Sequence, residues 1–144
     1  MVTKNEFEAL DDVKASRFHG YDYNELIDTM KVEIYVQADD QDYQGDSIYL
    51  IRKRNANADG EKYFGILVFG WGSCSGCDSA QAVENAQEAT ALRNDLYNGI
   101  VWVGSTLDDV RRYVDKRDWK GTWLNDNLVK DFQAQVKGIT DLKD

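Results

Sequence analysis

The stretch from Tyr63 to Asp78, Y-F-G-I-L-V-F-G-W-G-S-C-S-G-C-D, places the tightest constraint on how this chain folds. Its first part is apolar on both faces apart from Gly65, which is the pattern of a strand at the centre of a sheet with a layer on each side. A glycine-rich turn follows, and the only two cysteines, Cys74 and Cys77, fall where a helix is expected to begin. The segment is therefore either a chemical centre or a tightly specified structural corner.

Length and composition indicate one globular domain spanning residues 1–144. The chain has 144 residues, 42% of them hydrophobic, so it can bury a sizeable core. The apolar run from Tyr63 to Trp71 has about half the length that a membrane-spanning helix needs. The first residues, M-V-T-K-N-E-F-E, lack the basic and apolar regions of a signal peptide. We therefore expect a cytoplasmic protein with no membrane contact.

Hydrophobic periodicity and turn residues predict an α+β domain. The expected elements are a helix at 3–17, a short helix at 24–30, strands at 31–37, 47–54 and 62–69, a helix at 78–96, a strand at 100–103, and helices at 106–115 and 125–136. This order predicts a mostly antiparallel four-stranded sheet, made of a β-hairpin or meander plus one β-α-β unit and packed by three to five helices. The strand–helix–strand unit from Tyr63 to Val103 implies one parallel pairing.

Local signals predict several boundaries and faces. Asn24 is expected to cap the short second helix, and Ser105 or Thr106 the helix that follows the fourth strand. The alternation of Val32, Ile34 and Val36 predicts that these three side chains share one face of the first strand. The Asn98-Gly99 pair is expected to end the long helix.

The charge balance argues against direct binding to nucleic acid. Seventeen basic residues stand against 26 acidic ones, a net charge of −9, so phosphate backbones are repelled unless a basic face is segregated. The two basic clusters are interleaved with or close to acids, and they comprise Arg52, Lys53 and Arg54, and Arg111, Arg112, Lys116, Arg117 and Lys120. Two interpretations stay open: the acidity keeps the protein soluble, or an acidic surface mimics DNA and engages a protein's DNA-binding groove.

Redox and metal chemistry are two hypotheses for the cysteine pair. A strand, an aromatic turn, C-x-x-C and a helix form the local arrangement of dithiol oxidoreductases, and a helix N-terminus favours the thiolate. Against redox chemistry, a hairpin precedes the motif and the chain has no proline to face the dithiol. A zinc site needs four ligands, which Cys74, Cys77, Asp78 and His19 would supply, or two chains would share four cysteines.

Three other interpretations of the same corner remain. A cysteine–histidine dyad would have to recruit His19 from far along the chain. The backbone N–H groups of the turn form a weak candidate for anion binding, through Gly72, Ser73, Ser75 and Gly76. The P-loop lysine is missing, so nucleotide hydrolysis is not expected. The structural alternative is that both cysteines are small packing residues at a sharp bend.

Two sequence motifs resemble a family of small uncharacterised proteins encoded by bacteriophages and prophages. They are G-W-G-S-C-S-G-C-D at 70–78 and D-W-K-G-T-W at 118–123, and the resemblance spans about 62–124. It implies a phage origin and a location in the host cytoplasm. The family has no assigned activity to carry over.

These observations lead to a hypothesis of a non-enzymatic binding protein that modulates a host protein, for example as an inhibitor of a nuclease or of a defence system. The expected binding surface is acidic and aromatic and comprises Asp39, Asp40, Asp42, Asp46, Trp119 and Trp123. The protein is expected to need no cofactor and to be a monomer or homodimer. The alternative is a thiol-dependent redox protein, or a zinc-binding protein, acting through Cys74 and Cys77.

Overall fold

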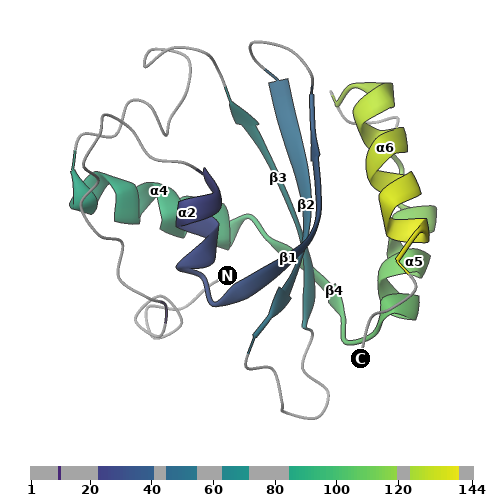
Figure 1. Ribbon diagram of the computed structural model, residues 1–144, viewed down its shortest axis with the longest axis horizontal. Helices are drawn as coiled ribbons and strands as arrows, with labels where there is room; N and C mark the ends of the chain where they lie inside the picture. The colour runs from purple at the N-terminus through teal and green to yellow at the C-terminus, as the bar shows by residue number, and fades with distance from the viewer. Residues whose placement is uncertain are drawn as a thin grey trace.

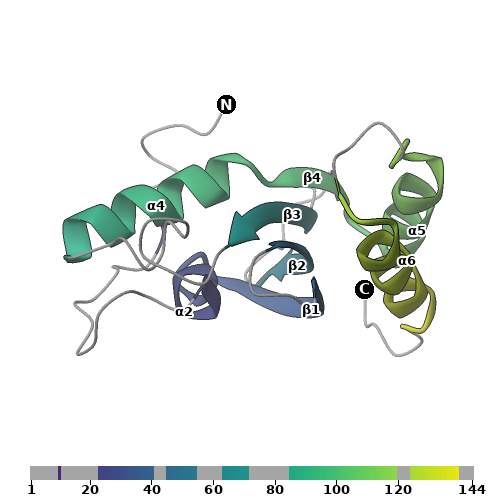
Figure 2. The ribbon, with the colours of Figure 1, turned by 90° about the horizontal axis from the view of Figure 1, so that it is seen from above.

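The computed structural model describes residue 10 and residues 23–40, 45–54, 63–71, 85–119 and 124–139. Its centre is a four-stranded antiparallel sheet in the order β1-β2-β3-β4, formed by β1 (Val32–Asp39), β2 (Gly45–Lys53), β3 (Phe64–Trp71) and β4 (Val101–Gly104). One side carries α2 (Tyr23–Asp28) and α4 (Ala86–Asn98), and the other carries α5 (Leu107–Lys116) and α6 (Asp126–Lys137) (Figures 1 and 2). The predicted α+β class is confirmed.

The two central strands, β2 and β3, bury side chains on both faces of the sheet. Leu50 and Ile66 belong to a core shared with α5 and α6, whereas Tyr49, Ile51 and Leu67 belong to a second core shared with α2 and α4. Successive side chains of a strand point to opposite faces, so an uninterrupted apolar run serves both cores. The prediction that the third strand lies inside the sheet, with a layer on each side, is confirmed.

A bulge in β1 overturns the prediction that Val32, Ile34 and Val36 share a face. Ile34 pairs with Ile51 and Val36 with Leu50, so the register shifts between Ile34 and Val36. Val32 is buried in the α2–α4 core, Val36 is buried in the α5–α6 core, and Ile34 is 37% exposed. One extra residue in a strand reverses its alternation, and the sequence pattern carries no sign of it.

The prediction of a parallel pair is wrong, because β3 and β4 are antiparallel. Val101 pairs with Ile66 and Gly104 with Phe64, so β4 enters beside the third residue of β3 and runs back toward its start. A parallel crossover would need the helix to return the chain to the starting end of β3. Figure 1 shows instead that α4 lies across the strand direction, which delivers the chain beside Ile66 rather than beside the first residue of β3.

Two of the predictions made for helix ends are confirmed, and one is wrong. Thr106 caps α5, and α4 ends at Asn98, where the Gly99 N–H donates to the carbonyls of the last turn. Asn24, however, lies inside α2, which begins at Tyr23, so it is not the predicted cap. Its side chain accepts a hydrogen bond from the Tyr49 hydroxyl at 2.6 Å, and this tertiary contact replaces the capping role.

The N-terminus of α5 is held by a reciprocal capping box. The Thr106 hydroxyl accepts from the Asp109 N–H at 3.2 Å, while the Asp109 carboxylate accepts from the N–H groups of Ser105 and Thr106 at 3.1 and 3.2 Å. The hydrogen bond from the Ser105 N–H, with those from Thr106 and the nearby Arg112 charge, holds the Asp109 pKa below its ordinary value of 3.8. A lowered pKa means that the carboxylate stabilises the fold above that value and stops doing so as the pH falls through the folded-state pKa.

We expect Thr106→Ala to lower the free energy of unfolding at neutral pH by about 1 kcal/mol, because it removes the cap acceptor. Asp109→Asn should remove part of the stability loss that the wild type shows on acidification. Urea denaturation at pH 7 and at a series of acidic pH values measures both effects. Ser105→Ala is the control, since the cap uses only the Ser105 backbone N–H. A Thr106→Ala variant as stable as this control would refute the capping role.

Candidate binding site

The cysteine corner lies outside the described residues, as do the other residues on which its hypotheses depend. They are His19, Gly72, Ser73, Cys74, Ser75, Gly76, Cys77 and Asp78. The redox, zinc and anion-binding hypotheses therefore stay predictions. Within the described ranges, no group of three or more His, Cys, Asp or Glu residues is placed to hold a metal ion. Trp71, the last described residue before the corner, pairs with Gly45 at the start of β2.

Three of the predicted acidic residues flank the turn between β1 and β2. The Asp39 carboxylate accepts hydrogen bonds from the Ser47 hydroxyl and, at 2.9 Å, from the Gln37 amide. The Asp40 carboxylate accepts from the Asp46 N–H at 2.8 Å, and the Asp40 N–H donates to the Asp46 carbonyl at 3.0 Å. Hydrogen bonds accepted by the Asp39 and Asp40 carboxylates thus connect the two strands at the end of the hairpin. Asp42 lies outside the described residues.

A chain of side-chain hydrogen bonds connects this hairpin to α2. The Tyr49 hydroxyl donates to Asn24, the Asn24 amide donates to Gln37 at 3.1 Å, and the Gln37 amide donates to Asp39. Ser47 completes the chain from the neighbouring strand. Because each of these side chains is hydrogen-bonded to the next, the chain of bonds connects the acidic hairpin to the short helix α2.

We expect Asp40→Ala to lower the free energy of unfolding by about 1 kcal/mol, since it removes the acceptor of the Asp46 N–H at the hairpin end. Asp40→Asn keeps a side-chain oxygen in that position and should remain close to the wild type. Thermal and urea denaturation of both variants measures the difference. Equal stability of the two variants would show that the hydrogen bond contributes nothing.

Trp119 lies mainly inside the α5–α6 core. Its side chain is 9% exposed, its indole N–H donates to the Val114 carbonyl at 3.0 Å, and its ring centroid is 6.1 Å from that of Phe132. The Arg117 guanidinium carbon lies 4.3 Å from the centroid of the same ring. The tryptophan therefore offers only a small part of its ring to another molecule. Trp123, the second predicted aromatic residue, lies outside the described residues.

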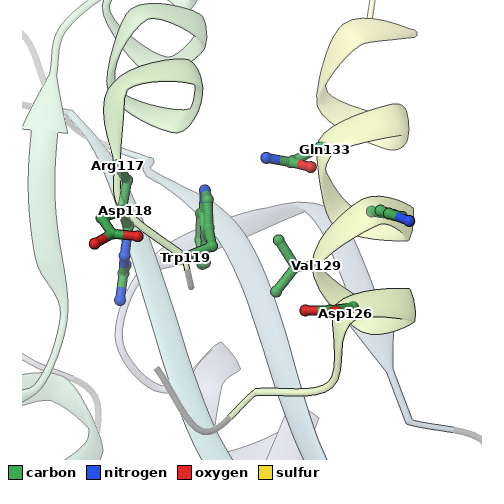
Figure 3. A pocket seen from close by; sticks show the side chains of 7 residues that line it. Arg117, Asp118, Trp119, Asp126, Val129 and Gln133 are labelled. Atoms are coloured by element: carbon green, nitrogen blue, oxygen red, sulfur yellow. The ribbon is translucent and has the colours of Figure 1, made fainter. Parts of the chain in front are cut away.

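A pocket of about 610 Å³ opens between the end of α5 and the first turns of α6. Figure 3 shows α6 side chains facing Trp119 across it. Its lining comprises Arg117, Asp118, Trp119, Asp126, Val129, Lys130 and Gln133. Trp119 and Val129 are buried and form an apolar floor, whereas Asp118, Asp126 and Lys130 are exposed. The volume falls in the range of about 300–1,000 Å³ that is typical of binding pockets.

The α6 residues of this pocket were missed by the sequence analysis. Asp126, Val129, Lys130 and Gln133 recur at spacings of three and four residues, so they share one face of the helix. That spacing was present in the sequence, but it does not reveal that Trp119 faces this side of α6. The pocket exists only because a tertiary contact brings the two segments together.

A smaller groove of about 410 Å³ lies between α2 and the outer edge of β1. It is lined by Asn24, Glu25, Asp28, Val32, Ile34 and Arg54. An ion pair between Arg54 and Asp28, at 2.5 Å, joins two of its lining residues.

The basic clusters contact carboxylates and aromatic rings of their own chain. Arg111 and Arg112 lie 3.8 and 3.6 Å from Asp108 and Asp109, and the Lys53 amine lies 4.7 Å from the Trp102 ring centroid. These contacts agree with the interleaving of charges seen in the sequence.

Comparison with known proteins found no matching family model, no similar curated protein and no similar solved structure. The search for membrane spans, which covered the described residues, found no helix with the length and apolar character needed to cross a bilayer.

Proposed function

We propose that this is a non-enzymatic binding protein that modulates a partner protein, and that the pocket between α5 and α6 receives a side chain of that partner. The observation that supports this proposal most directly is the composition of the pocket. It has a buried floor of Trp119 and Val129 beside a rim that includes Arg117 and Asp118. Aromatic residues and arginine are enriched where protein interfaces gain most of their affinity, and such centres are bordered by polar rims.

The rigidity of the pocket supports this role. Trp119 is fixed by its hydrogen bond to Val114 and by packing against Phe132. The helix that forms the other wall packs on the sheet through buried side chains, including Leu128, Phe132 and Val136. A preformed site loses little conformational entropy on binding, so more of each contact appears as affinity.

The net charge of −9 supports a basic partner, because a strongly acidic protein attracts such partners over long range. Asp39 and Asp40 contribute to this field although their carboxylates make intramolecular hydrogen bonds. The resemblance to phage proteins extends the proposal: the partner would be a host protein in the cytoplasm, such as a nuclease or a component of a defence system. A DNA-like acidic surface is one form that such inhibition takes.

Site-specific photocrosslinking tests the proposal. A photoreactive amino acid replaces Gln133, inside the pocket, or Gln87, an exposed glutamine on α4 at the far side of the sheet. The full chain is then irradiated in host lysate. We expect one discrete adduct from position 133 and none from position 87. An adduct from position 87 alone, or no adduct from either position, would contradict the proposal.

A separate measurement tests the alternative hypothesis of thiol chemistry. Alkylation rates of Cys74 and Cys77 across a pH series report their thiolate fraction. Reaction well below the pH expected of a free cysteine, whose pKa is about 8.5, would favour thiol chemistry, and inert thiols would favour packing.

A further inference from the structure

We propose that the side chain received by the α5–α6 pocket is basic, a lysine or an arginine of the partner protein. This inference rests on the proposed function and adds the chemistry of the docked group. The pocket joins an apolar floor to hydrogen-bond acceptors, which is the combination that a long side chain with a cationic end requires.

The acceptors come from the α6 wall. In Figure 3 the Asp126 carboxylate and the Gln133 side chain extend from α6 toward Trp119, with Val129 between them. A methylene stem lying along Val129 and the small exposed part of Trp119 would place its charged end within reach of these two polar groups.

Two cations of the pocket need to be reconciled with a basic guest. Arg117 is already engaged with the Trp119 ring, whose centroid lies 4.3 Å from its guanidinium carbon. Lys130 is exposed and lies one helical turn after Asp126. The lining is thus balanced in formal charge, and the long-range field of a chain with a net charge of −9 decides the sign of the preferred guest.

An acidic guest is the competing occupant. It would bind Arg117 or Lys130, but it would approach the carboxylates of Asp118 and Asp126 and would face the net negative charge of the whole chain. The two guests therefore predict opposite effects for substitutions of Asp126 and Lys130, which are close neighbours on one helix.

A nuclear magnetic resonance titration of the full ¹⁵N-labelled chain separates them. The probes are N-acetyl-argininamide and N-acetyl-glutamic acid amide at millimolar concentration. The readout is the indole N–H of Trp119 with the backbone amides of Val129 and Gln133. We expect saturable shifts with the arginine probe and none with the glutamic acid probe. Asp126→Asn should weaken arginine binding about two- to fivefold, as loss of an exposed charge contact does, and Lys130→Gln should preserve or tighten it.

The outcomes distinguish this inference from the proposed function. Shifts from the glutamic acid probe that Lys130→Gln abolishes would overturn the basic guest and leave the pocket as a docking site. Absence of shifts with either probe, together with an adduct at position 133, would also overturn the basic guest alone. Loss of the adduct at position 133 would overturn the docking site itself. Circular dichroism of both variants checks that the overall helix content is unchanged.

Discussion

Replacing Phe132 with alanine is expected to lower the free energy of unfolding by about 3–5 kcal/mol, the usual cost of removing a buried aromatic side chain. Phe132 is 0% exposed and belongs to the core that α5 and α6 share with the sheet. Its ring also packs against Trp119, so its loss should loosen the floor of the pocket. Urea denaturation measures the stability change.

Gln133→Ala is the matched control, because Gln133 is the next residue on α6 and is only partly buried. It should change stability by less than about 0.5 kcal/mol, as most surface substitutions do. Since a domain of this size is stable by only about 5–15 kcal/mol, Phe132→Leu provides a milder variant that remains folded. A loss below 1 kcal/mol for Phe132→Ala would mean that α6 does not pack on the sheet as described.

The second large effect is expected at Gly65, in the part of β3 that pairs with β4. A Cβ atom at this position would lie 2.5 Å from Cγ2 of Ile100 and 2.9 Å from Cε3 of Trp102. Gly65→Ala should therefore lower the free energy of unfolding by about 1–3 kcal/mol through overpacking. The glycine lets Ile100 and Trp102 lie directly against the strand, which the close antiparallel approach of β4 requires.

A double-mutant cycle tests this explanation. Ile100→Ala removes the nearest clashing atom, so Gly65→Ala should cost less in the Ile100→Ala background than in the wild type. Four denaturation curves give the coupling free energy between the two positions. Strict additivity, or a stable Gly65→Ala single variant, would contradict the packing of β4 against β3.

Much of the fold followed from local sequence signals. The cap at Thr106, one of the two residues predicted for it, needs only the first turn of its own helix, and the helix end at Gly99 needs only its own turn. The apolar run of β3 placed that strand inside the sheet because burial on two faces demands such a run.

The incorrect predictions each depended on a contact between distant segments. The bulge in β1 is defined by its pairing with β2, and the role of Asn24 by the Tyr49 hydroxyl. The direction of β4 depends on how α4 crosses the sheet, which no local pattern encodes (Figure 1). The candidate pocket also depends on a contact between distant segments, because it forms only where Trp119 lies against one face of α6.

The structure also gives different roles to the acidic and the aromatic residues of the predicted binding surface. Asp39 and Asp40 make hydrogen bonds that close the β1–β2 hairpin, so their substitution would alter stability as well as surface charge. Trp119 remains a candidate for contact with a partner, as part of the floor of a pocket rather than as an exposed ring. Experiments on the acidic residues therefore need a stability measurement beside each binding measurement.

Hydrogen exchange of the full chain, with and without the partner captured at position 133, tests the central claim most directly. The claim is that the α5–α6 end meets the partner while the hairpin carboxylates maintain the fold. We predict that added protection concentrates in 117–119 and 126–133 and leaves 36–40 and 45–48 unchanged. Protection confined to the hairpin strands, with the α5–α6 segments exchanging as in the free protein, would contradict the account.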